Sequence, residues 1–175
     1  ITRLQSPGAP LEINEVIIDN KGLLGMCCCP GRIESDGRSA RQRDLRADLA
    51  VIVAWRPDRV VSLVEMPEFA DLGVPQLPGE FESRFCWHHW PVQDLQAPVV
   101  TEASPRFLTQ LFDGLSKGER ILLHCAAGLG RTGTVAAHLL MMSGLPADQA
   151  INTVRKARPG TIESVVQERS LRGEA

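Results

Sequence analysis

Several features are missing from this sequence, and each absence argues against a class of protein. No apolar run approaches the ~18 residues that a membrane-spanning helix requires. There is no excess of basic residues, since 19 Lys and Arg stand against 21 Asp and Glu, for a net charge of -2 and a pI of about 6.1. The composition therefore predicts affinity neither for nucleic acid nor for acidic membranes. The first ten residues contain no basic-then-apolar leader, so we expect no secretory signal.

The cysteines also lack the pattern of a disulfide framework. There are five, at positions 27, 28, 29, 86 and 125, and an odd set with three adjacent members indicates a reducing compartment, for which we expect the cytoplasm. Successive residues of a strand point to opposite faces, so Cys27–Cys29 cannot easily converge on one metal ion. We expect these thiols to pack as small apolar side chains in a buried strand.

What is present is the composition of one ordinary domain. The chain has 175 residues, of which 43% are hydrophobic and 23% charged, so we expect a single domain over 1–175, acting as a monomer. Short apolar runs bounded by turn residues predict strands at 13–18, 23–29, 60–64, 85–90 and 121–124. Helical spacing predicts helices at 45–55, 104–115, 131–143, 146–157 and 161–171. Residues 32–43 are predicted to form a polar loop, and 65–79 a loop with one short helix.

This order of elements predicts the fold class. Strands separated by helices, with a helical C-terminal third, are typical of an α/β sandwich. We expect a central, largely parallel sheet of about five strands flanked by helices.

The most informative segment is 121–143, an apolar strand, a Gly-rich loop and an amphipathic helix that begins ILLHCAAGLGRTG. Glycines let such a loop turn its amide N–H groups inward, and the helix N-terminus adds positive charge, so an anion site is predicted. Residues 128–133 also match the dinucleotide-binding fingerprint G-x-G-x-x-G, which requires a second strand ending in an acidic residue about 20 positions on. Asp148 lies at about that distance but in a predicted helix, and the 42 residues after Gly133 are too few for the remaining strands. A nucleotide P-loop needs a lysine, and this loop has none.

A third interpretation uses Cys125 and Arg131, which have five residues between them. The positive electrostatic field of the loop amides and the helix N-terminus, which favours phosphate, also stabilises a cysteine thiolate at the mouth of the loop. Arg131 offers a planar fork for two phosphoryl oxygens, and the Thr132 hydroxyl can donate to the sulfur. This interpretation gives every polar side chain of the loop a role.

Residues 124–133 resemble the signature H-C-x-x-G-x-x-R-S/T-G of protein-tyrosine and dual-specificity phosphatases at every position. The resemblance implies a phosphatase-type sandwich and hydrolysis of a phosphate monoester through a phosphocysteine on Cys125, with no metal and no cofactor. It also implies that the loop holds the phosphate, through Ala126, Ala127, Gly128, Leu129, Gly130 and Arg131.

Such enzymes carry a general acid on a loop about 30 residues before the nucleophile, and Asp94 lies 31 positions upstream of Cys125. Asp113 falls in a predicted helix and Asp71 is more distant, so the resemblance favours Asp94. The segment 158–167 resembles the one that carries a water-positioning glutamine, which implies this role for Gln167. Arg158 is expected to support the loop from outside.

We expect the histidines near this loop to have structural and not catalytic roles. His124 is expected to hold the loop in shape through a backbone hydrogen bond. Cys86, His88 and His89 could suggest a metal site, but adjacent strand residues diverge, and packing is the better interpretation.

From about residue 23 onward the chain is most similar to the kinase-associated dual-specificity phosphatases, except that 65–82 has no clear counterpart. The variable loop positions Ala126, Ala127 and Leu129 are apolar, which favours a singly phosphorylated substrate. A phosphorylated protein is expected; a small phosphorylated metabolite and a non-catalytic phosphate-binding module are the alternatives. Neither nucleic acid nor a membrane is an expected partner.

Overall fold

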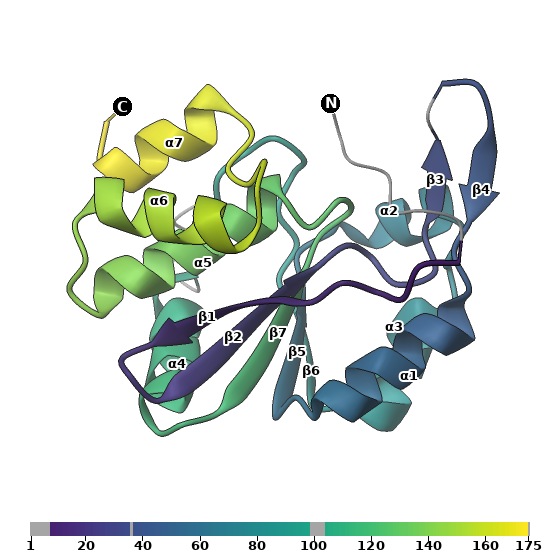
Figure 1. The fold of residues 1–175 in the computed structure, drawn as a ribbon, viewed down its shortest axis with the longest axis horizontal. Coiled ribbons are helices and arrows are strands. Elements are labelled where there is room, and N and C mark those ends of the chain that lie inside the picture. The colour runs from purple at the N-terminus through teal and green to yellow at the C-terminus, as the bar shows by residue number, and fades with distance from the viewer. Residues whose placement is uncertain (1–7, 36, 99–103, 175) are drawn as a thin grey trace.

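The computed structural model describes residues 8–35, 37–98 and 104–174 and is built on a five-stranded sheet (Figure 1). The strand order is β1 (Asn14–Ile18), β2 (Gly22–Cys27), β7 (Arg120–His124), β5 (Arg59–Ser62) and β6 (Trp87–His89). β1 pairs antiparallel with β2, and the other three pairings are parallel. The predicted α/β fold with a largely parallel sheet of about five strands is confirmed.

Helices cover both faces of this sheet. α1 (Leu45–Trp55), α2 (Met66–Asp71) and α3 (Leu77–Arg84) lie on one side, and α4 (Ser104–Ser116), α5 (Gly130–Met142), α6 (Ala147–Ala157) and α7 (Val165–Arg172) lie on the other (Figure 1). α5 contacts β2 and packs against α4, α6 and α7, so its first turns are buried almost all round. The helix that begins in the Gly-rich loop is thus the best-packed helix of its layer.

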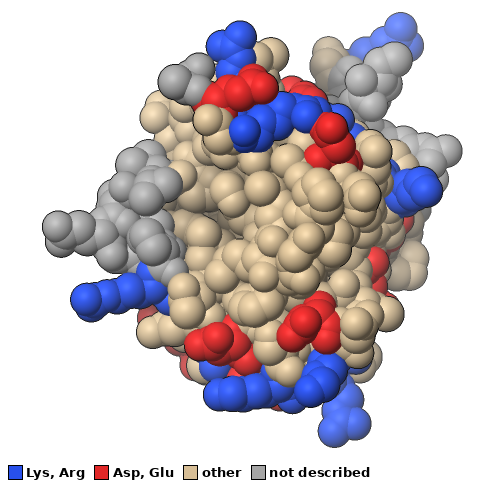
Figure 2. Space-filling model, turned by 90° about the vertical axis from the view of Figure 1, so that its left-hand side faces the viewer, with Lys and Arg blue, Asp and Glu red and all other residues tan. Residues whose placement is uncertain are grey.

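One side of the molecule is poor in charged residues at its centre. Seen from the left-hand side of Figure 1, it presents a broad area without charged side chains, bordered by residues of both signs (Figure 2). Among the described residues, no helix has the length and apolar character needed to cross a membrane.

The prediction of a polar loop at 32–43 was wrong, because this segment contains a small antiparallel hairpin of β3 (Ile33–Ser35) and β4 (Ala40–Gln42). Its strands have three residues each, and β4 is exposed along its whole length. Strands this short and this solvated carry no apolar alternation from which they could be predicted.

The prediction of a single short helix in 65–79 was also wrong, since both α2 and α3 begin within that range. Pro67 and Pro78 occupy the first turns of these helices, where the missing N–H has no partner to lose. α7 begins at Val165 rather than at Thr161, because Ser164 and Gln167 form a capping box there.

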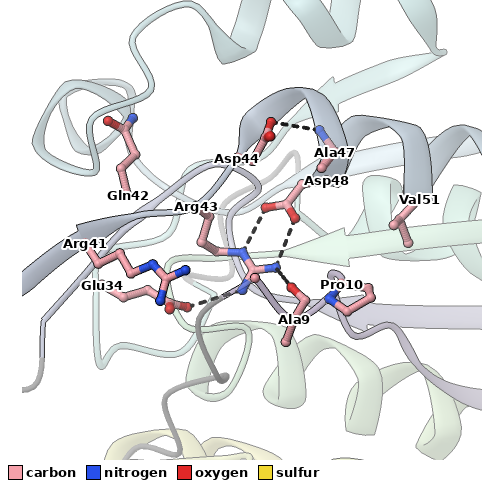
Figure 3. Close-up of a pocket in the computed structure, with 11 residues that line it drawn as sticks. Ala9, Pro10, Glu34, Arg41, Gln42, Arg43, Asp44, Ala47, Asp48 and Val51 are labelled. Atoms are coloured by element: carbon pink, nitrogen blue, oxygen red, sulfur yellow. Dashed lines mark hydrogen bonds and ion pairs between the residues drawn. The ribbon is translucent and has the colours of Figure 1, made fainter.

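A buried ion pair fixes the hairpin to α1 (Figure 3). Arg43 donates from Nε and Nη2 to the two carboxylate oxygens of Asp48, at 2.8 and 2.9 Å, and the two side chains are 7% and 4% exposed. The same carboxylate accepts the N–H of Gly31 at 2.9 Å, and the Arg43 guanidinium also approaches Glu34 and the Ala9 carbonyl. Asp48 thereby holds both the turn after β2 and the hairpin that follows it.

Candidate active site

The site residues come from the carboxyl ends of four neighbouring parallel strands. Residues 125–131, the phosphate loop, follow β7, and Asp94 follows β6. The turn at 30–32 follows β2, and α2 follows β5. In open α/β sheets, ligands bind beyond the carboxyl ends of the strands. The topology therefore brings together segments that lie almost 100 residues apart in the sequence.

The phosphate loop is shaped by contacts on its outer side. Gly128 has a φ of +72°, and a Cβ there would overlap the carbonyl of Cys27 on β2, so only glycine fits. Arg158 donates from Nε to the Gly128 carbonyl at 2.7 Å and from Nη2 to the Ala127 carbonyl at 3.0 Å, as expected for a group that braces the loop. With these two carbonyls held on the outer side, the loop can turn amide N–H groups inward toward an anion, while the Gly130 N–H bonds to Glu163.

Arg131 is the most constrained side chain of the site. It is 1% exposed, and its two Nη atoms donate to the two Glu68 oxygens at 2.7 and 3.0 Å. Nη1 also donates to the Val92 carbonyl at 2.9 Å, and Nη2 lies 3.4 Å from Oδ1 of Asp94. The guanidinium is thus oriented by a bidentate carboxylate, which is the strongest of the common hydrogen-bonding arrangements.

Glu68 is the functional residue that the sequence did not reveal. It lies in α2, and its Oε2 also accepts the backbone N–H of Glu65 at 2.7 Å. The spacing Glu65-x-x-Glu68 with Pro67 is a recognisable helix start. That signal could have located the helix, but not the partner of its carboxylate 63 residues away.

Asp94 lies in a loop that is fixed at the start of α7. Its own Oδ1 accepts the N–H of Leu95, whose φ of +61° is in the left-handed region. The Leu95 carbonyl accepts from Ser164 Oγ at 2.6 Å. Of the three aspartates weighed as the acid, Asp94 is the one that pairs with Arg131 among the described residues, while Asp113 lies in α4 and Asp71 ends α2.

Gln167 lies beside the loop, but its amide is largely occupied. Oε1 accepts the N–H groups of Glu163 and Ser164 at 2.9 and 3.1 Å, and Nε2 donates to the Gln96 carbonyl at 3.2 Å. The amide abuts Gly130, since a Cβ there would lie 2.9 Å from Nε2. One N–H of Nε2 is therefore all that remains for a water molecule.

A second carboxylate, Glu163, also reaches the loop. A Cβ on Gly130 would lie 2.7 Å from its Oε2. Partial burial and the nearby Asp94 raise the pKa of Glu163, and the Gly130 N–H and the guanidiniums of Arg131 and Arg32 offset part of this rise. The rim of the site thus carries two carboxylates, and sequence reasoning assigned only one of them.

Unpartnered polar atoms gather at this site. Among the described residues, three of the five buried side-chain nitrogen or oxygen atoms without a hydrogen-bond partner are Nε of Arg32, Nε of Arg131 and Oγ1 of Thr132. The hydrogen bond expected from Thr132 to the sulfur of Cys125 is not formed. A buried donor without a partner costs about 1–3 kcal/mol, so such atoms need an explanation, and a bound phosphoryl group would supply acceptors.

His124 is part of a buried hydrogen-bonded chain next to Cys125. Trp87 Nε1 donates to Ser62 Oγ at 2.8 Å, and Ser62 Oγ lies 2.5 Å from His124 Nε2. His124 Nδ1 lies 3.0 Å from the Cys125 carbonyl, which is the expected backbone contact. Indole N–H is only a donor and a carbonyl only an acceptor, so the chain requires the Nδ1–H tautomer with Ser62 donating to Nε2.

This environment predicts a pH dependence of stability. Burial lowers the pKa of His124 from 6.5 to about 4, so between these values the unfolded chain binds a proton that the folded protein does not. The free energy of unfolding should therefore fall by about 3 kcal/mol from this group as the pH drops from 7 to 4. Burial also lowers the pKa of His138 and His88, which adds a fall of the same sign. NMR titration of the imidazoles would contradict this if none of them titrated well below 6.

Of the remaining cysteine and histidine candidates, Cys27–Cys29 and His89 have packing roles, whereas the packing expected of Cys86 is not found, because its side chain is exposed. Cys27–Cys29 are all buried, and burial raises the pKa of each thiol. His89 stacks on Trp87 and hydrogen-bonds to the Val64 carbonyl at 2.7 Å. Within the part of the chain that the structure describes, no group of three or more His, Cys, Asp or Glu is arranged to hold a metal ion.

Comparison with known proteins identifies relatives of this arrangement. The family described as "Polymorphic toxin system, DSP-PTPase phosphatase" matches residues 46–145, more than half of the chain. Cyclin-dependent kinase inhibitor 3 of Mus musculus is 27% identical over 147 residues, covering 82% of this chain and 67% of the relative. Tyrosine-protein phosphatase CDC14 of Saccharomyces cerevisiae is 43% identical over 101 residues, covering 57% of this chain and 16% of the relative.

Solved structures agree with this assignment. Kinase associated phosphatase (KAP), with serine in place of its catalytic-site cysteine, superimposes with a TM-score of 0.84 at 24% identity over 94% of both chains, which shows the shared fold. Tk-PTP in its active form gives a TM-score of 0.65 at 30% identity, covering 87% of this chain and 92% of that one. The chain therefore belongs to the DSP-PTPase phosphatase family described for polymorphic toxin systems, and it is a cysteine-dependent protein-tyrosine/dual-specificity phosphatase.

Proposed function

We propose that this enzyme hydrolyses phosphate monoesters on proteins in two steps, with Cys125 as the nucleophile. In the first step the Cys125 thiolate attacks phosphorus, an S–P bond forms, and the ester P–O bond breaks as Asp94 protonates the leaving oxygen. In the second step a water molecule attacks the phosphocysteine, Asp94 takes a proton from it, and the S–P bond breaks to release phosphate. The loop amides of 126–131 and Arg131 hold the three equatorial oxygens throughout.

The observation that carries the proposal is the 3.4 Å approach of Asp94 Oδ1 to Arg131 Nη2. Arg131 is the last residue of the phosphate loop, and its guanidinium also contacts Asp94 in the loop after β6. A phosphoryl group bound at Nε of Arg131 would therefore lie within reach of Asp94. The orphaned Nε and the bidentate anchoring of both Nη atoms on Glu68 support the same placement.

Two further residues keep smaller roles in the proposal. Thr132 has a buried, unpartnered hydroxyl that would donate to the sulfur as the thiolate departs in the second step. Gln167 would contact the attacking water through its one uncommitted N–H. Its other hydrogen bonds hold residues 96, 163 and 164, so loss of Gln167 would also loosen the acid loop.

For the acid, Asp94→Asn is expected to lower kcat on a substrate with a poor leaving group by about 100-fold or more. Asparagine has the same shape and keeps the loop contacts, but it cannot donate a proton of carboxyl acidity. The loss should be much smaller on an aryl phosphate whose leaving group is a nitrophenolate, because that oxygen needs little protonation. Steady-state kinetics on both substrates test this, and an equal loss on both would exclude Asp94 as the acid.

The substrate is proposed to be a phosphorylated protein, with a small phosphorylated metabolite as the alternative. Catalytic efficiencies should be compared across phosphotyrosyl, phosphoseryl and phosphothreonyl peptides, phosphorylated sugars and nucleotides. The protein assignment requires that at least one peptide class exceeds every metabolite by about tenfold or more in kcat/KM. A metabolite that exceeded all the peptides would overturn it.

The proposal also includes a mechanism without metal, in a monomer that works in a reducing cytoplasm. Vanadate should inhibit the enzyme, and chelators should leave its rate unchanged. Loss of activity with a chelator, restored by added metal, would contradict the thiol mechanism. Sedimentation at working concentration tests the oligomeric state.

A further inference from the structure

Arg32 is a charged side chain at the phosphate loop that the mechanism above does not use. It follows β2 in the turn that Asp48 holds, and its backbone is fixed on both sides. Its N–H donates to the Cys29 carbonyl at 3.3 Å, and its carbonyl accepts from the Arg43 N–H at 3.0 Å. Arg43 is itself held by the buried pair with Asp48 (Figure 3). The start of the side chain is therefore placed as firmly as the loop it approaches.

The side chain reaches the residue next to the nucleophile. Nη1 of Arg32 donates to the Ala126 carbonyl at 2.7 Å. That carbonyl already accepts the Cys29 N–H at 2.9 Å, so the loop does not depend on Arg32 to satisfy it. The loop is also braced by Arg158 through two carbonyls. A role in supporting the loop therefore does not account for the presence of a guanidinium at position 32.

Arg32 differs from the other guanidiniums near the loop in what it lacks. Arg131 is paired with Glu68, Arg43 with Asp48, and Arg158 fills three acceptors. For Arg32, the described residues provide one side-chain hydrogen bond and no carboxylate within ion-pair distance, and its buried Nε has no partner. Of the five N–H donors of this guanidinium, the hydrogen bond to Ala126 uses one, and the two Nη atoms keep donors for a further acceptor.

The neighbours of Arg32 place its charge at the phosphate loop. Arg32 donates to the carbonyl of Ala126, the residue that follows Cys125, and its charge acts on Glu163 together with that of Arg131. The side chains at Ala126, Ala127 and Leu129 are apolar, so the loop itself offers no cation beyond Arg131 for a second anion. Among the described residues, Arg32 is a cation beside the loop that has no carboxylate within ion-pair distance.

We propose that Arg32 binds a second anionic group of the substrate, a carboxylate carried by a residue next to the phosphorylated one. The enzyme would then prefer phosphorylated protein segments with acidic flanks. This inference rests on the proposed function, because it takes a protein as the substrate. A planar fork suits a carboxylate, and the pair would be partly desolvated at the rim of the site, where it is worth more than an exposed ion pair.

The test uses two phosphotyrosyl peptides that differ only in having Glu or Gln on both sides of the phosphorylated residue. The wild-type enzyme is expected to have a kcat/KM roughly tenfold higher for the Glu peptide. Arg32→Gln should bring this ratio close to one, and Arg32→Lys should leave an intermediate value. Arg41→Gln, the same charge change at an exposed position on β4, should keep the wild-type ratio. The wild-type preference should also weaken as salt is raised.

The ratio separates recognition from bracing. If Arg32 only supported the loop, Arg32→Gln would lower both efficiencies equally and leave the ratio unchanged, which would overturn the proposal. If Arg32→Gln failed to fold, the wild-type enzyme alone would still test the proposal. A wild-type ratio of the two kcat/KM values near one, or a ratio that does not respond to salt, would overturn it. Efficient hydrolysis of both peptides without preference rejects the role of Arg32 alone. If neither is hydrolysed, the same Glu and Gln pair is made with phosphoserine and with phosphothreonine, and failure of all three pairs rejects the proposed function as well.

Discussion

Replacing Cys125 with serine is expected to lower kcat on an aryl phosphate by at least about 10⁴-fold while phosphate binding is retained. A serine hydroxyl is not ionised near neutral pH, and the loop cannot lower its pKa far enough to make it a nucleophile. The groups that we propose to bind the anion, the amides of 126–131 and the guanidinium of Arg131, are untouched. Initial rates and calorimetric titration with inorganic phosphate measure the two quantities separately.

The matched control for this variant is Cys86→Ser. Cys86 is exposed and lies just before β6, so the same chemical change there should leave both rate and binding near their wild-type values. A Cys125→Ser protein that retained more than about a hundredth of the wild-type rate would remove Cys125 as the nucleophile. Loss of phosphate binding together with turnover would instead mean that the variant loop no longer forms.

The parts of this site that could be predicted are those whose physics is local. Residues 124–133 contain within ten positions a strand end, a tight loop and a helix start, and each step depends on neighbours in sequence. Asp94 follows β6 and Cys125 follows β7, two parallel strands that are consecutive along the chain with β5 between them in the sheet, so the spacing known from the resemblance was enough to indicate Asp94. The parallel sheet could likewise be predicted, because buried strands are continuous apolar runs.

The parts that could not be predicted depend on contacts between distant segments. Glu68 is an ordinary acidic residue in a helix start, and only the pairing of β5 with β7 places it against Arg131. Arg32 is one of several arginines in a polar stretch, and only its contact with Ala126, 94 positions away, distinguishes it from the others. The resemblance that implied a role for Gln167 gave no sign that three backbone groups already occupy its amide.

The second large effect is expected at Arg131, where Arg131→Lys should lower kcat/KM by roughly 10³-fold. The guanidinium has enough donors to serve the two Glu68 oxygens and the Val92 carbonyl and still offer Nε to a phosphoryl oxygen. A lysine ammonium is a point charge with three donors, and at this position Glu68 would compete with the phosphate for it. The charge would be conserved, so the loss would measure geometry and not net charge.

Glu68→Gln separates the two parts of this argument. It leaves the arginine in place with a neutral partner, so we expect a smaller loss, of about tenfold, from an Arg131 that is less firmly oriented. In the double variant the losses should not add, because a lysine that no longer faces a carboxylate is free to turn toward the phosphate. Steady-state kinetics of the four proteins, with denaturant unfolding to confirm that each is folded, give the coupling. Strictly additive losses would mean that Glu68 does not orient Arg131 for catalysis and that their bidentate contact serves the fold alone.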